Sequence, residues 1–238
     1  MHPITRAVLA TALLPAAAFA QGTHVCEARS AAQPPAIVEL YTSEGCSSCP
    51  PADRWLSTLK GRNDVIAMAF HVNYWDRLGW PDRFATPEIT ERQHLLAQTS
   101  GSSYVYTPQV VQNGRDWRHW SGTSPARLPS STIALALKRD GNTVTASIGA
   151  GNDRLAGYWA VLEDGHNTRV RAGENAGETL KHDHVVTLYK PVDAWAARDA
   201  KQLTLTLPQA SGGNARRVVF VVTDAAAQRP LQALALGC

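Results

Sequence analysis

"AIVELYTSEGCSSCPPAD", residues 36 to 53, joins an apolar run to two cysteines and then to a helix-like stretch. The run "AIVELYT" (36–42) predicts a buried strand. The residues after the cysteines predict a helix from about Cys49 to Lys60. Cys46 and Cys49 are therefore expected at a junction between a strand and the start of a helix, with the spacing C-x-x-C.

Two cysteines at such a junction favour redox chemistry. At the amino-terminal end of a helix, unpaired backbone N–H groups and the helix dipole stabilise a thiolate, so we expect the pKa of the Cys46 thiol to lie below that of a free thiol. Cys49 lies one turn along and is placed to attack a mixed disulfide formed at Cys46. The spacing thus predicts Cys46 as the nucleophile and Cys49 as the resolving cysteine.

Two other roles for the cysteine pair remain open. Cys46 and Cys49 can form a static disulfide, although so short a loop restrains the unfolded chain poorly. They can also hold copper or zinc, with His71 as a third ligand, because thiolate and imidazole suit these metals. A four-cysteine zinc site is not indicated, since Cys26 and Cys238 lie near opposite ends of the chain. We assign no metal ligands and expect no cofactor.

Residues 1–20 have the features of a secretory signal peptide. Arg6 precedes a mostly apolar stretch over residues 7–17, and "AFA" at residues 18–20 forms a cleavage site. We expect cleavage after Ala20, a periplasmic or secreted protein, and no membrane span. The formal net charge of +3 is too small to favour a nucleic acid or an anionic membrane as partner.

The first half of the chain alternates between strand-like and helix-like stretches, the pattern of a βαβ unit followed by a hairpin. The second helix is expected over residues 87–99, because Thr86 is a good N-cap and Pro87 a favoured first helical residue. The pair Asn113-Gly114 predicts a tight hairpin turn of type I′.

The pattern changes near residue 128. Beyond it, roughly eight short β-like segments follow one another, often separated by turn signals, which favours a small sandwich or barrel. The sequence therefore predicts two domains after the signal peptide, residues 21–128 and residues 129–238, the second being all-β and sandwich-like.

Three motifs together resemble one known family. They are "VELYTSEGCSSCPPAD" (38–53), "FHVNYWDRLGW" (70–80) and "VYTPQVVQNGR" (105–115). The chain is similar to an uncharacterised bacterial family of secreted thioredoxin-like proteins, a domain of unknown function. The resemblance implies an α/β thioredoxin-like fold for the first domain and supplies no reaction. The expected fold is therefore an α/β thioredoxin-like domain followed by an all-β sandwich-like domain.

The resemblance also implies a substrate site and a proton acceptor. Thioredoxin-like proteins generally carry a cis-proline loop that faces the C-x-x-C, and Thr107-Pro108 lies at the matching place. The backbone before that proline is expected to pair with an extended substrate chain. In thioredoxin a buried aspartate on the strand before the cysteines helps to move protons. Here Glu39 is the nearest carboxylate on that strand, and it is either a buried proton acceptor or simply solvated.

The aromatic and histidine residues give weaker signals. Trp75 and Trp80, in "NYWDRLGW" (73–80), either wall a groove near the cysteines or pack as core under a loop. Trp75 is taken as a candidate substrate-binding residue. His182 and His184 share one face of an expected strand, a weak metal pattern that is more often just exposed.

Cys26 and Cys238 remain once the C-x-x-C pair is set aside. They are even in number in a secreted chain, and the termini of a domain often lie close together, so we predict a structural disulfide between them. The alternative is that mobile chain ends leave both thiols free or linked between molecules.

These features favour a thiol-disulfide oxidoreductase that acts on protein or peptide thiols and disulfides with an unknown redox partner. Cys46, Cys49 and Pro108 are its expected catalytic residues, and Thr107 joins Trp75 in the substrate site. Two alternatives from other classes stay open. One is a non-catalytic binding protein on a thioredoxin-like scaffold, and the other is a copper- or zinc-handling protein that uses the C-x-x-C. Analogy of fold does not choose among the three.

Overall fold

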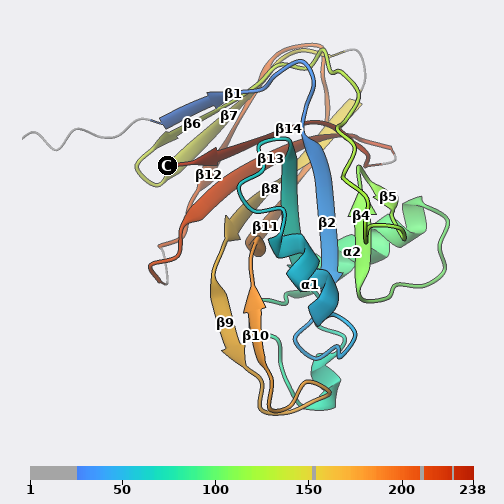
Figure 1. The fold of residues 1–238 in the computed structure, drawn as a ribbon. Coiled ribbons are helices and arrows are strands. Elements are labelled where there is room, and N and C mark those ends of the chain that lie inside the picture. The colour runs from blue at the N-terminus through green and yellow to red at the C-terminus, as the bar shows by residue number, and fades with distance from the viewer. Residues whose placement is uncertain (1–25, 152–153, 210–211, 227) are drawn as a thin grey trace, which may run out of the picture.

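The computed structural model describes residues 26–151, 154–209, 212–226 and 228–238. Its largest element is a mixed sheet of eight strands that runs through the molecule (Figure 1). In spatial order these strands are β14 (Pro230–Gly237), β13 (Arg216–Asp224), β8 (Arg154–Glu163), β11 (Val185–Ala196), β3 (Val65–His71), β2 (Ala36–Thr42), β4 (Gln109–Gln112) and β5 (Arg115–Asp116).

In the described part of the chain, two smaller sheets and three helices complete the fold. The four-stranded sheet has the order β1 (Cys26–Arg29), β6 (Leu135–Asp140), β7 (Thr143–Ile148) and β12 (Lys201–Thr206), and the two-stranded sheet pairs β10 (Thr179–His182) with β9 (His166–Arg169). The helices are α1 (Pro50–Ser57), the short 3₁₀ helix η1 (Asp76–Leu78) and α2 (Pro87–Thr99).

Strands β2 and β3 lie side by side in parallel, in register from Ala36↔Val65 to Thr42↔His71. Every residue of both strands is buried, because helices or loops cover both faces of the sheet at this point. A strand buried on both sides has no need of a polar face, so both strands appear in the sequence as nearly continuous apolar runs. Helix α1 forms the crossover between the two strands.

The two α-helices cover opposite faces of β2. Leu56 of α1 belongs to one buried cluster with Val38, whereas Ile89 of α2 belongs to another with Ile37. The alternation of side chains along a strand makes these two faces distinct. The expected start of α2 is confirmed, since the Thr86 hydroxyl accepts a hydrogen bond from the Ile89 N–H at 3.3 Å.

The expected fold, an α/β thioredoxin-like domain followed by an all-β sandwich-like domain, is wrong. The described residues are mostly β, with only two α-helices, and the main sheet continues across residue 128. Strand β11 pairs in parallel with β3 at Val185↔Ala69 and runs antiparallel to β8 on its other side. The apolar runs of the second half are largely buried on both faces in β8 and β13, so they extend this sheet. The division into two domains stays a prediction.

The four-stranded sheet packs on the part of the main sheet that contains β8 and β13. Leu137 of β6 and Val144 of β7 share a buried cluster with Trp159 of β8 and Phe220 of β13. The rings of Trp159 and Phe220 lie 4.6 Å apart between their centroids. This contact between two sheets forms a third apolar core in the described residues, separate from the two beside α1 and α2.

A disulfide joins Cys26 in β1 to Cys238, directly after β14. The two Cα atoms are 6.3 Å apart, a separation that disulfides commonly span. Because β1 belongs to the four-stranded sheet and β14 to the edge of the main sheet, the bond links the two layers covalently. The expected signal peptide, residues 1–20 with cleavage after Ala20, lies outside the described residues.

Removal of this disulfide is expected to lower the free energy of unfolding. The bond spans 212 residues of chain, and loss of a native disulfide typically costs roughly 2–5 kcal/mol. Urea denaturation of the Cys26→Ser/Cys238→Ser variant beside the unaltered protein measures the difference, and non-reducing peptide mapping checks the pairing. An unchanged midpoint, or Cys238 linked to a second molecule, contradicts a structural role.

Candidate functional site

Cys46 and Cys49 form a disulfide in the loop that leads from β2 into α1. Both cysteines have an exposed fraction of 0%. Cys49 is the N-cap residue of α1, and Pro50 and Pro51 occupy the first helical positions. The pair therefore lies at the junction of strand and helix that the sequence predicts, in its oxidised form.

The first turn of α1 offers fewer free amides than most helices do. Pro50 and Pro51 have no backbone N–H, and the Cys49 N–H already bonds to the Cys46 carbonyl oxygen at 3.2 Å. A hydroxyl takes the place of these missing donors, because Ser48 Oγ lies 3.4 Å from Cys46 Sγ. The side chain between the cysteines, as well as the helix, can thus stabilise a thiolate at Cys46.

Thr107, Pro108 and Trp75 lie together beside this loop. The Thr107–Pro108 peptide bond is cis, and Trp75 Nε1 donates to Thr107 Oγ1 at 2.7 Å. Trp75 also packs against the loop itself, since a Cβ on Gly45 would come within 3.0 Å of the Trp75 Cβ. Strand β4, which follows Pro108 directly, pairs with β2 and so brings these residues to the end of β2 where the cysteine loop begins.

Glu39 lies on the other face of the sheet. Its carboxylate forms an ion pair with Arg92 of α2 and accepts hydrogen bonds from the hydroxyls of Tyr41, at 3.0 Å, and Tyr158, at 2.7 Å. Burial, reinforced by the Glu39 charge, raises the pKa of both tyrosines well above its ordinary value. The α1 side of β2, which carries Val38, is the side toward the cysteines, so the structure does not bring Glu39 to them.

A group of buried ionisable side chains lies near the cysteine loop, and the sequence analysis missed most of it. Its members come from the loop, from α1, from the end of β3, from the segment after η1 and from β10, and all are less than about one-tenth exposed. They are Glu44, Asp53, His71, Asp82 and His182. We call these five residues the buried polar cluster.

His71 and Asp82 form the best-paired contact of the buried polar cluster. His71 Nδ1 lies 2.7 Å from Asp82 Oδ2, and Asp82 also accepts from the Glu44 N–H at 2.8 Å. Burial alone would lower the pKa of His71, but the adjacent Asp82 carboxylate outweighs it and raises that pKa. Burial alone would raise the pKa of Asp82, and the His71 charge and its hydrogen bonds lower it instead.

Glu44 and His182 make the second contact of the cluster. Trp80 Nε1 donates to Glu44 Oε2 at 2.8 Å, and His182 Nε2 lies 3.5 Å from Glu44 Oε1. Burial favours a raised pKa for Glu44, but these contacts lower it on balance. The Trp80 indole N–H thus binds a buried carboxylate of the cluster.

Asp53 is the member of the cluster most directly connected to the cysteines. It lies four residues after Cys49 in the same stretch of helix, so the two side chains are neighbours on one face. Thr42 Oγ1 donates to Asp53 Oδ2 at 3.1 Å, while Asp53 Oδ1 has no hydrogen-bond partner among the described residues. Burial raises the pKa of Asp53 although the charges of His182 and His71 oppose the shift. The i, i+4 spacing from Cys49 was a usable signal in the sequence.

His182 and His184, expected to share an exposed face, are both buried and face different partners. His182 belongs to the buried polar cluster, whereas His184 has a positive φ of 58° and lies 2.9 Å from Arg217 Nη2 through its Nδ1. Burial, with the Arg217 charge adding to it, lowers the pKa of His184 to about 4. Among the described residues, no group of three or more His, Cys, Asp or Glu side chains is arranged to hold a metal ion.

The connection between β9 and β10, residues 170–178, covers the cysteine loop; we call it the covering segment. Glu174 accepts hydrogen bonds from the Ser47 N–H at 3.0 Å and from the Ser47 hydroxyl at 2.8 Å. Asn175 Nδ2 donates to the carbonyl oxygens of Glu44, at 2.9 Å, and Cys46, at 3.0 Å. Figure 1 shows the β9–β10 hairpin reaching down beside α1 to this loop. The contacts explain why the disulfide is buried.

Comparisons with known proteins place the fold beside two solved structures. The crystal structure of a protein from Agrobacterium tumefaciens is 26% identical, with 84% of this chain and 93% of that chain covered and a TM-score of 0.64. HBP35 of Porphyromonas gingivalis is 14% identical, with 87% of this chain and 76% of that chain covered and a TM-score of 0.59, a likeness of fold alone. No curated protein matches the sequence.

None of the helices in the described part of the chain is long and apolar enough to cross a membrane.

The family comparison covers the cysteine loop, the buried polar cluster and the covering segment together, because it matches residues 37–223. These residues match a family described as protein of unknown function (DUF1223), and the chain belongs to that family.

Proposed function

We propose that this protein is a thiol-disulfide oxidoreductase in which Cys46 is the nucleophile and Cys49 the resolving cysteine. The observation that carries the proposal is the Cys46–Cys49 disulfide at the start of α1, with Thr107 and Pro108 held beside it by Trp75. A cysteine pair that can form a disulfide within one turn can also exchange it with another disulfide.

The proposed exchange conserves atoms and electrons. The Cys46 thiolate attacks one sulfur of a substrate disulfide, an S–S bond forms, and the other substrate sulfur leaves as a thiolate. Cys49 then gives up its proton and attacks the Cys46 sulfur, which closes the Cys46–Cys49 disulfide and releases the second substrate thiolate. Two protein thiols are oxidised while one substrate disulfide is reduced, and the reverse sequence oxidises a substrate dithiol.

The surroundings of the pair fit a protein or peptide substrate. Trp75, Thr107 and Pro108 are half-buried next to the exposed Ser47 and Ser48, so an extended chain can lie across them. The redox partner is unknown. The two disulfides favour an oxidising compartment, in keeping with secretion after cleavage at Ala20.

Asp53 is the proposed proton acceptor for Cys49, in place of Glu39. It is buried one helical turn after Cys49, has an unpartnered oxygen, and lines a pocket of about 150 Å³ together with His182. A carboxyl group whose pKa is raised toward neutrality by burial accepts a proton more readily than a solvated one. Asp53 would therefore receive the Cys49 proton during resolution and return it when the disulfide is opened.

A non-catalytic binding protein is the second candidate, because one observation favours it. Cys46 and Cys49 are fully buried under the covering segment, and exchange begins only when a thiol reaches a sulfur. If the covering segment stays closed, the disulfide serves only as a structural link. The two candidates differ in whether this disulfide can be reduced while the protein remains folded.

Insulin reduction by dithiothreitol, with and without the protein, tests the leading proposal. We expect catalysis by the unaltered protein, none by Cys46→Ser, and a trapped mixed disulfide at Cys46 in Cys49→Ser, because only the resolving step is then lost. The Cys26→Ser/Cys238→Ser variant is the matched control and should retain catalysis if it folds. Absence of catalysis together with a Cys46–Cys49 disulfide that resists reduction in the folded protein would favour the binding protein.

Asn175→Ala is expected to speed reduction of the Cys46–Cys49 disulfide by dithiothreitol by roughly 30-fold. The substitution removes the two hydrogen bonds that Asn175 donates to the cysteine loop, each worth about 1 kcal/mol, and leaves those between Glu174 and Ser47 in place. Alkylation of the thiols at timed intervals, followed by peptide mapping, gives the rate. Asn167→Ala in the same hairpin is the control, since Asn167 Nδ2 donates to the Gly165 carbonyl oxygen and, within the described residues, forms no hydrogen bond to the cysteine loop. Equal rates in both variants would show that the segment does not govern access.

Asp53→Asn is expected to slow the resolving step by about 100-fold near neutral pH, within the usual range for loss of a general base. The loss should shrink as pH rises through about 8.5, where a free thiol ionises unaided. In the unaltered protein the rate should fall as pH drops through the raised pKa of Asp53, because the protonated carboxyl accepts no proton. Stopped-flow decay of the mixed disulfide across pH measures both profiles.

The control for this prediction is Asp64→Asn, which alters an exposed carboxylate paired with Arg62. Folded stability separates a chemical role from a structural one. Because the pKa of Asp53 is higher in the folded protein than in the unfolded chain, its protonated carboxyl contributes to the free energy of unfolding at low pH. That contribution is lost as pH rises from the unfolded pKa of about 3.9 through the raised folded pKa. Asp53→Asn should therefore not destabilise the protein at neutral pH, and a pH-independent rate loss with earlier urea unfolding would point to a structural role.

A further inference from the structure

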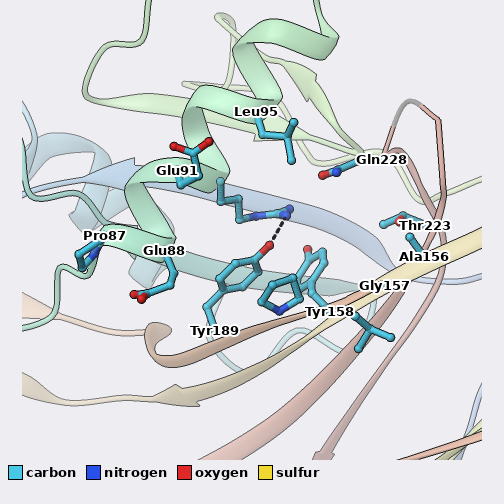
Figure 2. A pocket seen from close by; sticks show the side chains of 13 residues that line it. Pro87, Glu88, Glu91, Leu95, Ala156, Gly157, Tyr158, Tyr189, Thr223 and Gln228 are labelled. Atoms are coloured by element: carbon cyan, nitrogen blue, oxygen red, sulfur yellow. Dashed lines mark hydrogen bonds between the residues drawn. The ribbon is translucent and has the colours of Figure 1, made fainter. Parts of the chain in front are cut away.

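An unexplained feature outside the cysteine site is a pocket of about 460 Å³ on the α2 side of the main sheet. It lies between α2 and strands β8 and β11, and Figure 2 shows side chains from all three elements converging on it. Its volume falls in the range of small-molecule sites. The cysteine loop lies beside α1, which covers the opposite face of β2, so this pocket is independent of the proposed exchange chemistry.

The walls of the pocket are mainly apolar. Leu95 projects from α2, Tyr158 from β8 and Tyr189 from β11 (Figure 2). Pro191 and Val192 of β11 also line the pocket. Tyr189 is only half-buried and Pro191 is exposed, so an edge of this apolar surface faces solvent. A flat ring that entered the pocket would lose its contact with water on both faces and gain contacts with these side chains.

The charges around the pocket favour a cation. The positive charge of Arg92 is already compensated, because its guanidinium forms the ion pair with Glu39 and lies 4.1 Å from the centroid of the Tyr158 ring. Glu88 and Glu91 at the exposed end of the pocket form no ion pair within the described residues. The rim therefore carries two carboxylates that have no cationic side chain paired with them in the described part of the chain, beside an apolar interior.

We propose that this pocket binds a small aromatic cation, with the ring between Leu95 and Tyr189 and the positive group toward Glu88 and Glu91. An aromatic anion of the same size meets two like charges at the rim and finds Arg92 occupied. A neutral ring gains the apolar contacts only. The order of affinity is therefore cation, neutral ring, anion, which distinguishes this site from a general hydrophobic surface.

Calorimetric titration with tryptamine and with 3-indolepropionate tests the proposal, because the two probes share a ring and differ in charge. We expect tryptamine to bind at least about 10-fold more tightly at low salt, since each partly exposed charge contact contributes up to about 1 kcal/mol. Added salt should reduce the difference in affinity between the two probes, because it screens the rim charges. Equal binding of the two probes, tighter binding of the anion, or no binding of tryptamine overturns the proposal.

Two variants locate the site. Glu88→Gln/Glu91→Gln should weaken tryptamine about 10-fold and leave the affinity for neutral indole unchanged, because only the charges are removed. Leu95→Trp should fill the pocket and weaken all three probes. Glu178→Gln, which changes an exposed carboxylate far from α2 in the sequence, is the matched control and should leave the affinities of all three probes unchanged. Unchanged tryptamine binding by the double variant, with its urea midpoint unaltered, would place the probe elsewhere.

Discussion

The parallel pairing of β2 with β3 is the constraint on which the candidate site depends. Thr42 and His71 form the last pair of that register, and each holds a carboxylate: the Thr42 hydroxyl donates to Asp53, and His71 lies against Asp82. The loops that leave the two strands carry Cys46 and Trp75. A shift of one residue in this register would turn every side chain to the other face of the sheet. The buried carboxylates would then lose the partners that make their burial tolerable.

Burial of five ionisable side chains in one place is costly, and only part of that cost is offset. Asp82 is satisfied by His71 and by the Glu44 N–H. One oxygen each of Glu44 and Asp53 and ring nitrogens of His71 and His182 have no hydrogen-bond partner among the described residues. Apolar side chains of similar volume would usually give equal or greater stability. Buried polar atoms without partners call for a specific explanation, and a role in moving protons beside a cysteine pair provides one.

Local features of the sequence were sufficient to predict local features of the fold. Thr86 and Pro87 define the start of α2, and the positive φ angles of Asn113 and Gly114 suit the predicted turn. The fold class could not be predicted, because it depends on the single parallel contact between Val185 and Ala69, which are far apart in the chain. The buried polar cluster was missed for the same reason. Alternation along β2 placed Glu39 on the face opposite Val38, and only the tertiary structure showed that this face is buried against α2.

The disulfide between Cys26 and Cys238 makes the backbone between these residues a closed ring. One cut by a protease at an exposed turn, such as Asp140–Gly141, converts a ring into a single linear molecule and releases no fragment. The strands on either side of the cut remain paired with neighbours that belong to the same covalent unit. Exposed turns are the preferred points of attack by proteases, so a protein closed in this way can be cut once and still keep its two sheets together.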